Sequence, residues 1–167
     1  MKLFFQELLS RFLQENLLEY VVTPQSEIED LMVYVANPRK RQTPKLRPDF
    51  VIKKGRKIVA ILDAKYRDLW EKPLPPGMLY QLVMYALSQD TCNSATILYP
   101  TMQQDAQEAK IEVQIPTYSL GYVYVVLRPV NLLELEKLII DSRKKNNERE
   151  RANFATQLVY GRGIELM

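Results

Sequence analysis

The segment KIVAILDAKY, from Lys57 to Tyr66, constrains the fold more than any other part of the chain. It contains five consecutive apolar residues, Ile58 to Leu62, in which β-branched side chains prevail. A strand that is apolar on both faces must be covered on both, so the segment predicts a central strand with helices on either side of its sheet. Two charged residues, Asp63 and Lys65, close the segment and should share one face, because strand side chains two positions apart point the same way.

A second strand is predicted immediately before it, over 49–54, and Gly55-Arg56 between the two segments indicates a hairpin. Asp49 opens this earlier strand, fourteen positions before Asp63. An antiparallel pairing of the two strands would let the two carboxylates meet.

Apolar periodicity and turn residues predict the remaining elements. They are helices over 3–18, 78–88 and 132–143, and strands over 31–36, 94–99, 111–115 and 122–127. Asn131 with Glu134 resembles a capping box before the last helix, and the charged segment 144–151 is predicted to be mobile. The order predicts an α/β fold with a mixed central sheet flanked by helices. We expect one domain over 1–167, with a core at about 3–127 and a C-terminal helix and tail at 131–167.

The residue types that are absent exclude much of catalytic chemistry. The chain has no histidine and a single cysteine, Cys92, so serine–histidine triads, histidine-ligated metals and internal disulfides are excluded. Catalysis would have to use carboxylates, lysine or tyrosine. The unpaired cysteine and the lack of a long apolar run predict a cytoplasmic protein without a membrane span.

Asp49 and Asp63 predict a metal site. Two carboxylates that share a site repel each other unless a cation lies between them, and hard oxygen ligands favour Mg²⁺, with Mn²⁺ as the alternative. The backbone carbonyl of Ala64 is a further candidate ligand. Lys65 is placed to position a metal-bound water or to stabilise charge on a phosphate. Gln81 and Tyr85, four positions apart on the predicted helix, share a face and can support the site.

Positive charge is concentrated around these residues, although the formal net charge is only +3. Between positions 39 and 57 a single acid, Asp49, stands among nine basic residues: Arg39, Lys40, Arg41, Lys45, Arg47, Lys53, Lys54, Arg56 and Lys57. Such a patch is most often a solvated surface, but beside a candidate metal site it indicates contact with phosphates.

Pro48-Asp49 followed by Asp63-Ala64-Lys65 resembles the motif of the PD-(D/E)xK nuclease superfamily, and QLVMY, from Gln81 to Tyr85, resembles the QxxxY motif of its RecB-like branch. More closely, LRPDFVIKKGRKIVAILDAKYRDL, LYQLVMYAL and ILYP resemble the nuclease domain of McrC, the cleavage subunit of McrBC-type restriction systems. The resemblance covers about residues 3–100. The family often has a glutamate in its first helix, where this chain has Gln6 followed by Glu7, and an acid where Met78 stands.

The resemblance implies a restriction-endonuclease-like αβββαβ core and a Mg²⁺-dependent endodeoxyribonuclease in a modification-dependent restriction or defence system. Its implied catalytic residues are Asp49, Asp63, Lys65 and Gln81, with Asp49, Asp63 and the Ala64 carbonyl as metal ligands. The implied partners are DNA and an McrB-like AAA+ GTPase. Cutting both strands calls for two active sites, which predicts a homodimer on DNA.

Two alternatives remain open at this stage. The first is a non-catalytic DNA-binding or assembly subunit, motivated by Gln6 and by the N-terminal GTPase-contacting region that McrC proteins carry and this sequence lacks. The second is a RecB-like exonuclease, which would need free DNA ends.

Overall fold

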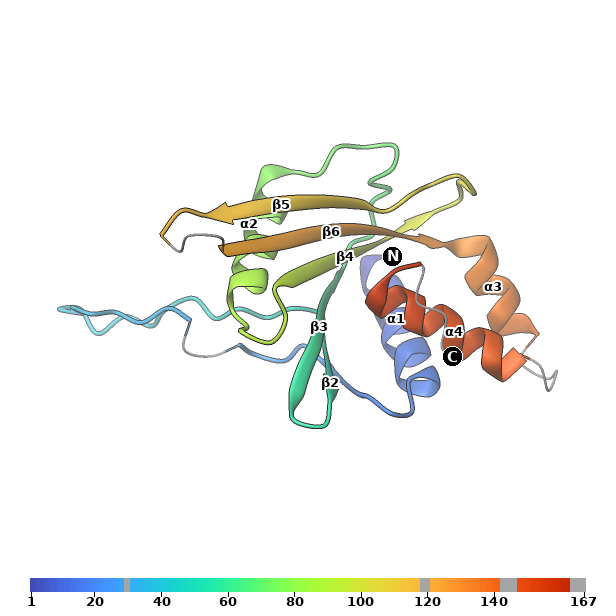
Figure 1. Cartoon of the computed structure of the whole chain (residues 1–167), viewed down its shortest axis with the longest axis horizontal. Coiled ribbons are helices and arrows are strands. Elements are labelled where there is room, and N and C mark those ends of the chain that lie inside the picture. The colour runs from blue at the N-terminus through green and yellow to red at the C-terminus, as the bar shows by residue number, and fades with distance from the viewer. Residues whose placement is uncertain (29–30, 118–120, 142–146, 163–167) are drawn as a thin grey trace.

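The protein is described here by a computed structural model that covers residues 1–28, 31–117, 121–141 and 147–162. Its elements in chain order are α1 (Lys2–Asn16), β1 (Val21–Pro24), β2 (Phe50–Lys54), β3 (Lys57–Ala64), α2 (Pro76–Leu87), β4 (Ser94–Thr101), β5 (Ala109–Ile115), β6 (Gly121–Asn131), α3 (Leu132–Ile140) and α4 (Asn147–Tyr160). The strands form one mixed sheet in the order β1-β2-β3-β4-β6-β5, with helices on both sides (Figure 1). The predicted α/β fold with a flanked mixed sheet is therefore confirmed.

Strand β3 lies inside the sheet, as its apolar run predicts. It pairs antiparallel with β2 on one side and parallel with β4 on the other, and its residues from Ala60 to Ala64 are buried. The predicted hairpin is also confirmed. Gly55 has φ +62° at the turn, a conformation that glycine adopts without a steric penalty.

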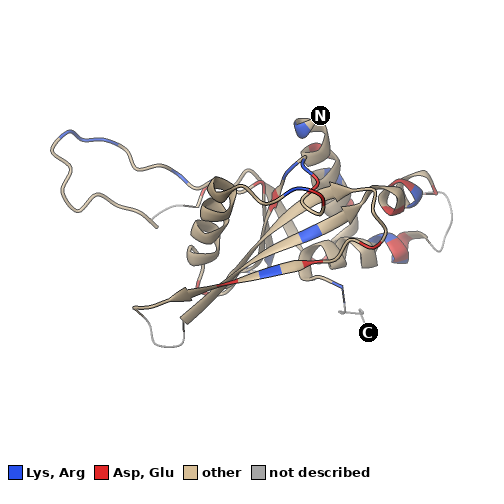
Figure 2. Cartoon of the chain, turned by 90° about the horizontal axis from the view of Figure 1, so that it is seen from above, with Lys and Arg blue, Asp and Glu red and all other residues tan. Residues whose placement is uncertain are grey.

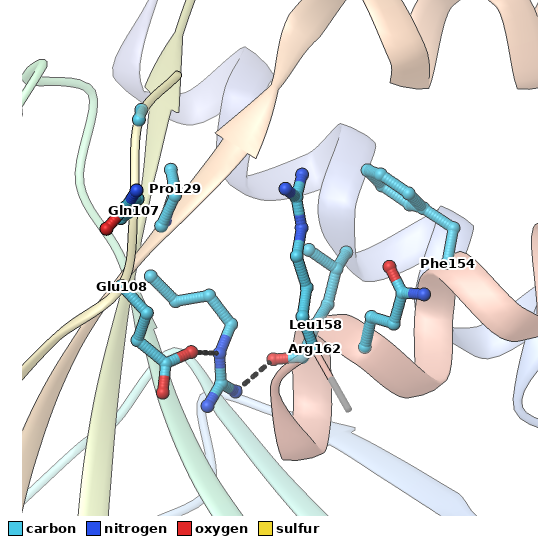
Figure 3. A pocket seen from close by; sticks show the side chains of 9 residues that line it. Gln107, Glu108, Pro129, Phe154, Leu158 and Arg162 are labelled. Atoms are coloured by element: carbon cyan, nitrogen blue, oxygen red, sulfur yellow. Dashed lines mark hydrogen bonds and ion pairs between the residues drawn. The ribbon is translucent and has the colours of Figure 1, made fainter. Parts of the chain in front are cut away.

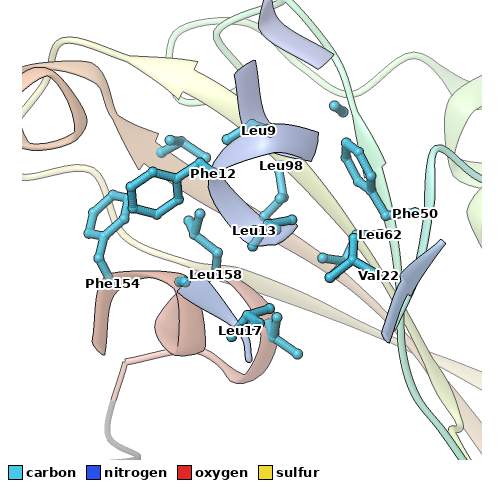
Figure 4. Close-up of a cluster of buried hydrophobic side chains, with 14 of the residues drawn as sticks. Leu9, Phe12, Leu13, Leu17, Val22, Phe50, Leu62, Leu98, Phe154 and Leu158 are labelled. Carbon is cyan, nitrogen blue, oxygen red and sulfur yellow. The ribbon is translucent and has the colours of Figure 1, made fainter. Parts of the chain in front are cut away.

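The two faces of the sheet have separate hydrophobic clusters. On one face α1 and α4 pack together, with the rings of Phe12 and Phe154 edge to face at 5.8 Å between centroids (Figure 4). On the other face α2 contributes Leu82 and the fully buried Tyr85, which pack with Ile97 of β4. The helix α2 thus covers the face opposite α1 and α4. Among the described helices, none combines the length and apolar character that crossing a membrane requires.

The strand predicted over 31–36 is wrong. These residues form no strand, and Val35 is fully exposed. The edge of β2 that faces away from β3 is paired with β1, a strand that the sequence pattern did not predict. A β-prone segment becomes a strand only where a partner offers backbone groups, and β1 already occupies that edge.

The prediction that residues 144–151 are mobile is wrong for positions 147–151, because α4 begins at Asn147. Positions 142–146 lie outside the described residues. Phe154 and Leu158, four positions apart, are buried against the core, as are Ala155 and Val159. The core therefore extends beyond position 127. The predicted cap is present, since Asn131 Oδ1 accepts from the Leu133 and Glu134 amides at 3.0 and 3.1 Å.

Candidate active site

The predicted site residues meet at the end of the β2–β3 hairpin. Phe50 pairs with Leu62, and one step further in this register Asp49 stands opposite Asp63. Lys65 follows directly after β3, and its backbone amide donates to the Leu98 carbonyl of β4 at 3.0 Å. The pairing of β3 with β2 and β4 thus places Asp49, Asp63 and Lys65 together.

The carboxylate of Asp49 is held from two directions. Its Oδ2 accepts from the backbone amide of Ala64 at 2.8 Å, and its Oδ1 accepts from Gln6 Nε2 on α1 at 2.8 Å. Gln6 was not among the predicted site residues, although it lies between core positions Phe5 and Leu9 of the first helix. Its neighbour Glu7 is exposed.

Asp63 is buried, with 2% of its surface exposed, and its Oδ2 lies 2.6 Å from Lys65 Nζ. This is an ion-pair contact whose angles fall outside hydrogen-bond geometry, so among the described residues Asp63 Oδ2 accepts no well-oriented hydrogen bond. A buried anionic oxygen in this state can still accept a donor or a cation.

Burial, followed by the negative charge of Asp63, raises the pKa of Asp49 to about 6. The Ala64 amide and the Lys65 ammonium act in the opposite direction and offset part of this rise in pKa. The charge of Asp63 therefore lies close enough to disfavour the charged form of Asp49. Two carboxylates face a single lysine, so the cluster has an excess of negative charge.

Gln81 lies at one remove from the carboxylates. Its Nε2 donates to Tyr85 Oη at 2.8 Å within α2. The pKa of Tyr85 is raised by burial first, and then by the charges of Asp63 and Asp49, so the phenol is within electrostatic range of both carboxylates. Within the described chain, Gln81 makes no hydrogen bond to the aspartates, so its link to the site passes through Tyr85.

The cluster fits a small, hard cation. Its side-chain oxygens are carboxylates, one of them without an oriented donor, and cation binding would relieve their repulsion. The described residues contain no group of three or more acidic, histidine or cysteine side chains that could hold a metal. Backbone oxygen and water would have to complete the coordination.

A long arm leads into this site. Residues 31–48, called the arm below, form part of the connection between β1 and β2, and positions 33–42 are exposed. Figure 2 shows the arm projecting from the body with basic residues along it. Within the predicted basic patch, Lys45 and Arg47 both pair with Glu27, at 2.7 and 2.5 Å. The part of the patch that lies on the arm is thus divided between a paired base and a projecting tip, and the rest of the patch lies on the β2–β3 hairpin.

A cavity on the face of the sheet that α1 and α4 cover contains a second group of charged residues, Arg128 and Glu108. Arg128 of β6 donates through Nε to Glu108 at 2.6 Å and through Nη1 to the Leu158 carbonyl of α4 at 2.8 Å (Figure 3). Leu158 belongs to the cluster formed with α1, whereas Tyr85 of the site belongs to the opposite cluster. The Arg128 contacts therefore fasten α4 to the sheet.

Comparison with known proteins agrees with this fold. No curated protein matches the chain. A chain of the refined half-complex from a tetradecameric assembly of Thermococcus gammatolerans McrB AAA+ hexamers with bound McrC superposes with a TM-score of 0.56 at 18% identity. The superposition covers 95% of this chain and 33% of that one, so the chain spans about a third of its length. The family model described as "McrBC 5-methylcytosine restriction system component" matches residues 1–100. The chain therefore belongs to the family of McrBC 5-methylcytosine restriction system components.

Proposed function

We propose that the protein is a metal-dependent endodeoxyribonuclease, the McrC-like cleavage component of a restriction system that acts on modified DNA. The observation that supports this most directly is the pair of facing carboxylates with Lys65 against Asp63. Family membership is consistent with it. A buried cluster with excess negative charge is unfavourable for folding, and such clusters are concentrated at functional sites.

The division of roles follows from the contacts. Asp49 and Asp63 bind the cation, with the Ala64 carbonyl as a further ligand, and a bound Mg²⁺ or Mn²⁺ neutralises phosphate charge and lowers the pKa of water. The Ala64 amide and Gln6 orient Asp49 and fix which lone pairs remain for the cation. Lys65 holds positive charge beside Asp63, where it can bind a phosphate oxygen or position a water. Gln81 supports the site through Tyr85.

The proposal includes partners. The solved structure similar to this chain is named for McrB AAA+ hexamers with bound McrC, and by analogy we infer an McrB-like AAA+ GTPase as the motor partner. Duplex DNA is the substrate, and two copies on DNA would supply the two sites needed to cut both strands. These roles place the protein in the cytoplasm.

A second candidate function is a non-catalytic DNA-binding or assembly subunit. It is favoured by Gln6, a neutral amide that donates to Asp49 where a third carboxylate would strengthen metal binding. Such a subunit would bind DNA without cutting it, even with a motor partner present.

Cleavage of closed circular and linear duplex DNA by the purified protein tests the proposal, with Mg²⁺, Mn²⁺ or a chelator and with an McrB-like partner present or absent. Metal-dependent nicking or linearisation of the circle by the wild type, lost in Asp63→Ala and Lys65→Ala, is the expected result. Degradation of linear DNA alone would indicate an exonuclease. Equal cleavage by wild type and both folded variants would contradict the proposed site, whereas folded wild type that binds without cutting under every condition would favour the non-catalytic subunit.

A further inference from the structure

The arm is fastened to the body at its base. The backbone amide of Ile28 donates to the Leu46 carbonyl at 2.8 Å, and Glu27 pairs with both Lys45 and Arg47. Ile28 and Leu46 also pack against the hydrophobic cluster beneath α2. These contacts hold Glu27 and Ile28, which precede the arm, beside Lys45 to Arg47 near its end. The end of the arm therefore has a fixed place on the body.

The tip of the arm is an organised turn. Asn37 Nδ2 donates to the Arg41 carbonyl at 2.7 Å, and the Arg41 amide donates back to Asn37 Oδ1 at 2.8 Å. Lys40 has φ +49°, in the left-handed region that side chains other than glycine seldom occupy. The energetically costly backbone conformation of Lys40 is thus maintained by the two hydrogen bonds between the Asn37 side chain and the Arg41 backbone.

Three consecutive cations stand on this turn: Arg39, Lys40 and Arg41. All three are exposed, and within the described chain none of their side chains makes an ion pair. This contrasts with Lys45 and Arg47 at the base, where Glu27 supplies an acidic partner. Adjacent like charges on an ordered turn repel each other, and a polyanion is the partner that relieves this repulsion.

The position of the arm relates it to the site. Its second limb ends at Pro48, which is buried, and the next residue is Asp49. Lys40 lies nine positions before Asp49, and nine extended residues span at most about 30 Å. At about 3.4 Å per base pair, the tip can reach phosphates up to about nine base pairs from the site.

We propose that the arm is a clamp for duplex DNA, in which Arg39, Lys40 and Arg41 contact the phosphate backbone several base pairs away from the bond that is cut. The clamp rests on the proposed nuclease function for its substrate. It assigns the DNA contact to the arm tip, whereas the base of the arm serves to direct it. The contact is with phosphates, so it adds affinity without reading the base sequence.

The test compares two triple variants in an Asp63→Ala background, where cleavage is blocked. The tip variant carries Arg39→Ala, Lys40→Ala and Arg41→Ala. The matched control carries Arg11→Ala, Lys137→Ala and Arg149→Ala, three exposed basic positions on α1, α3 and α4. Both variants lose the same net charge, so a difference between them reports position rather than total charge.

Binding of a labelled duplex of about 30 base pairs is measured by fluorescence anisotropy between about 50 and 200 mM salt. The tip variant has no cation at three positions that bind phosphate. Its negative slope of log K against log salt should therefore become shallower by about 3, and the control's slope should stay unchanged. Affinity of the tip variant should fall at least about tenfold at the low-salt end. Both variants should melt like their parent, because the replaced side chains are exposed.

Each outcome separates the clamp from the nuclease. An unchanged slope and affinity in the tip variant, with cleavage by the protein that retains Asp63, overturns the clamp alone. An equal loss in both triple variants also overturns it, because binding would then follow net charge. A tip-specific loss in a protein that never cleaves supports the clamp and contradicts the nuclease. Failure of the parent to bind duplex DNA overturns the clamp.

Discussion

The two faces of the sheet each carry a buried charged cluster, and the clusters are built differently. On the α4 face Arg128, with 7% of its surface exposed, has one carboxylate partner in Glu108 and one carbonyl partner in Leu158. At the end of the β2–β3 hairpin two carboxylates, Asp49 and Asp63, face one ammonium group. One cluster is balanced in charge and hydrogen bonds, and the other is not.

The difference separates a structural ion pair from a candidate active site. A balanced cluster loses stability when either partner is removed, because the remaining charge is left buried. An unbalanced cluster of like charges should gain stability when one charge is removed, while the chemistry that needs both is lost. The effects of single substitutions on stability and on cleavage should therefore be opposite in the two clusters.

The largest expected effect is that of Asp63→Asn on cleavage. Loss of a metal-binding carboxylate should reduce the metal-dependent cleavage rate about a thousandfold, an effect of the size seen when transition-state stabilisation is removed. The free energy of unfolding without metal should stay equal or rise, because repulsion with Asp49 disappears. Rate assays and urea denaturation on the same preparations measure both quantities. A strongly destabilised variant would mean that the aspartates form a structural cluster like that of Arg128.

The opposite pattern is expected for Arg128→Met. Glu108 and the Leu158 carbonyl would lose their donor, which should lower the free energy of unfolding by about 2 kcal/mol, less than for a fully buried pair because Glu108 is partly exposed. Cleavage at a temperature where the variant is folded should be unchanged. Urea denaturation checks the first statement and the DNA assay checks the second. The double variant Arg128→Met with Glu108→Gln should recover part of the loss.

The pH dependence of stability is a smaller and separate test of the unbalanced cluster. Folding raises the pKa of Asp49 from its ordinary 3.8 to about 6, so the folded protein binds more protons than the unfolded chain between about pH 4 and 6. The free energy of unfolding should therefore fall as pH rises through this window. A pKa shift of this size corresponds to a change of about 3 kcal/mol in the free energy of unfolding. Solvent screening reduces this change to about 1.5 kcal/mol, because the carboxyl is partly exposed.

Urea denaturation without divalent cations at the two ends of that window measures this effect. Asp49→Asn is the matched control and should show a flatter dependence. An identical pH dependence in wild type and Asp49→Asn would show that folding does not raise the pKa of Asp49.

The smallest expected effect is that of Gln6→Leu. Without the amide, Asp49 would keep its bond to the Ala64 amide but lose its second anchor, and cleavage should fall about tenfold, the lower end for groups that orient a metal ligand. Gln6→Glu is the informative companion, because a third carboxylate should destabilise the metal-free protein and increase its stabilisation by Mg²⁺. Thermal melts with and without Mg²⁺ distinguish the two variants. Equal cleavage by wild type and Gln6→Leu would remove Gln6 from the site.

Local patterns in the sequence were sufficient for the hairpin and for the meeting of Asp49, Asp63 and Lys65. Strand periodicity sets which side chains share a face, and Gly55 sets the turn, so the pairing follows from residues close together in the chain. The failures concern segments whose structure depends on distant partners. Residues 31–36 have β-prone side chains, but the edge of β2 is already occupied by β1, and α4 has charged first turns that hide its apolar stripe.

What the sequence by itself determined is therefore the fold class, the central strand β3 and the three charged residues near the end of the hairpin, because local apolar periodicity and a short hairpin turn are readable in the chain. The tertiary structure decided that Gln6, 43 positions away, donates to Asp49 and that Gln81 connects to the site through Tyr85. It also decided that the basic residues of the arm divide into a paired base and a projecting tip. The physical reason is that hydrogen bonds and ion pairs between distant segments depend on how the elements pack, and a linear pattern of residue types does not contain that packing.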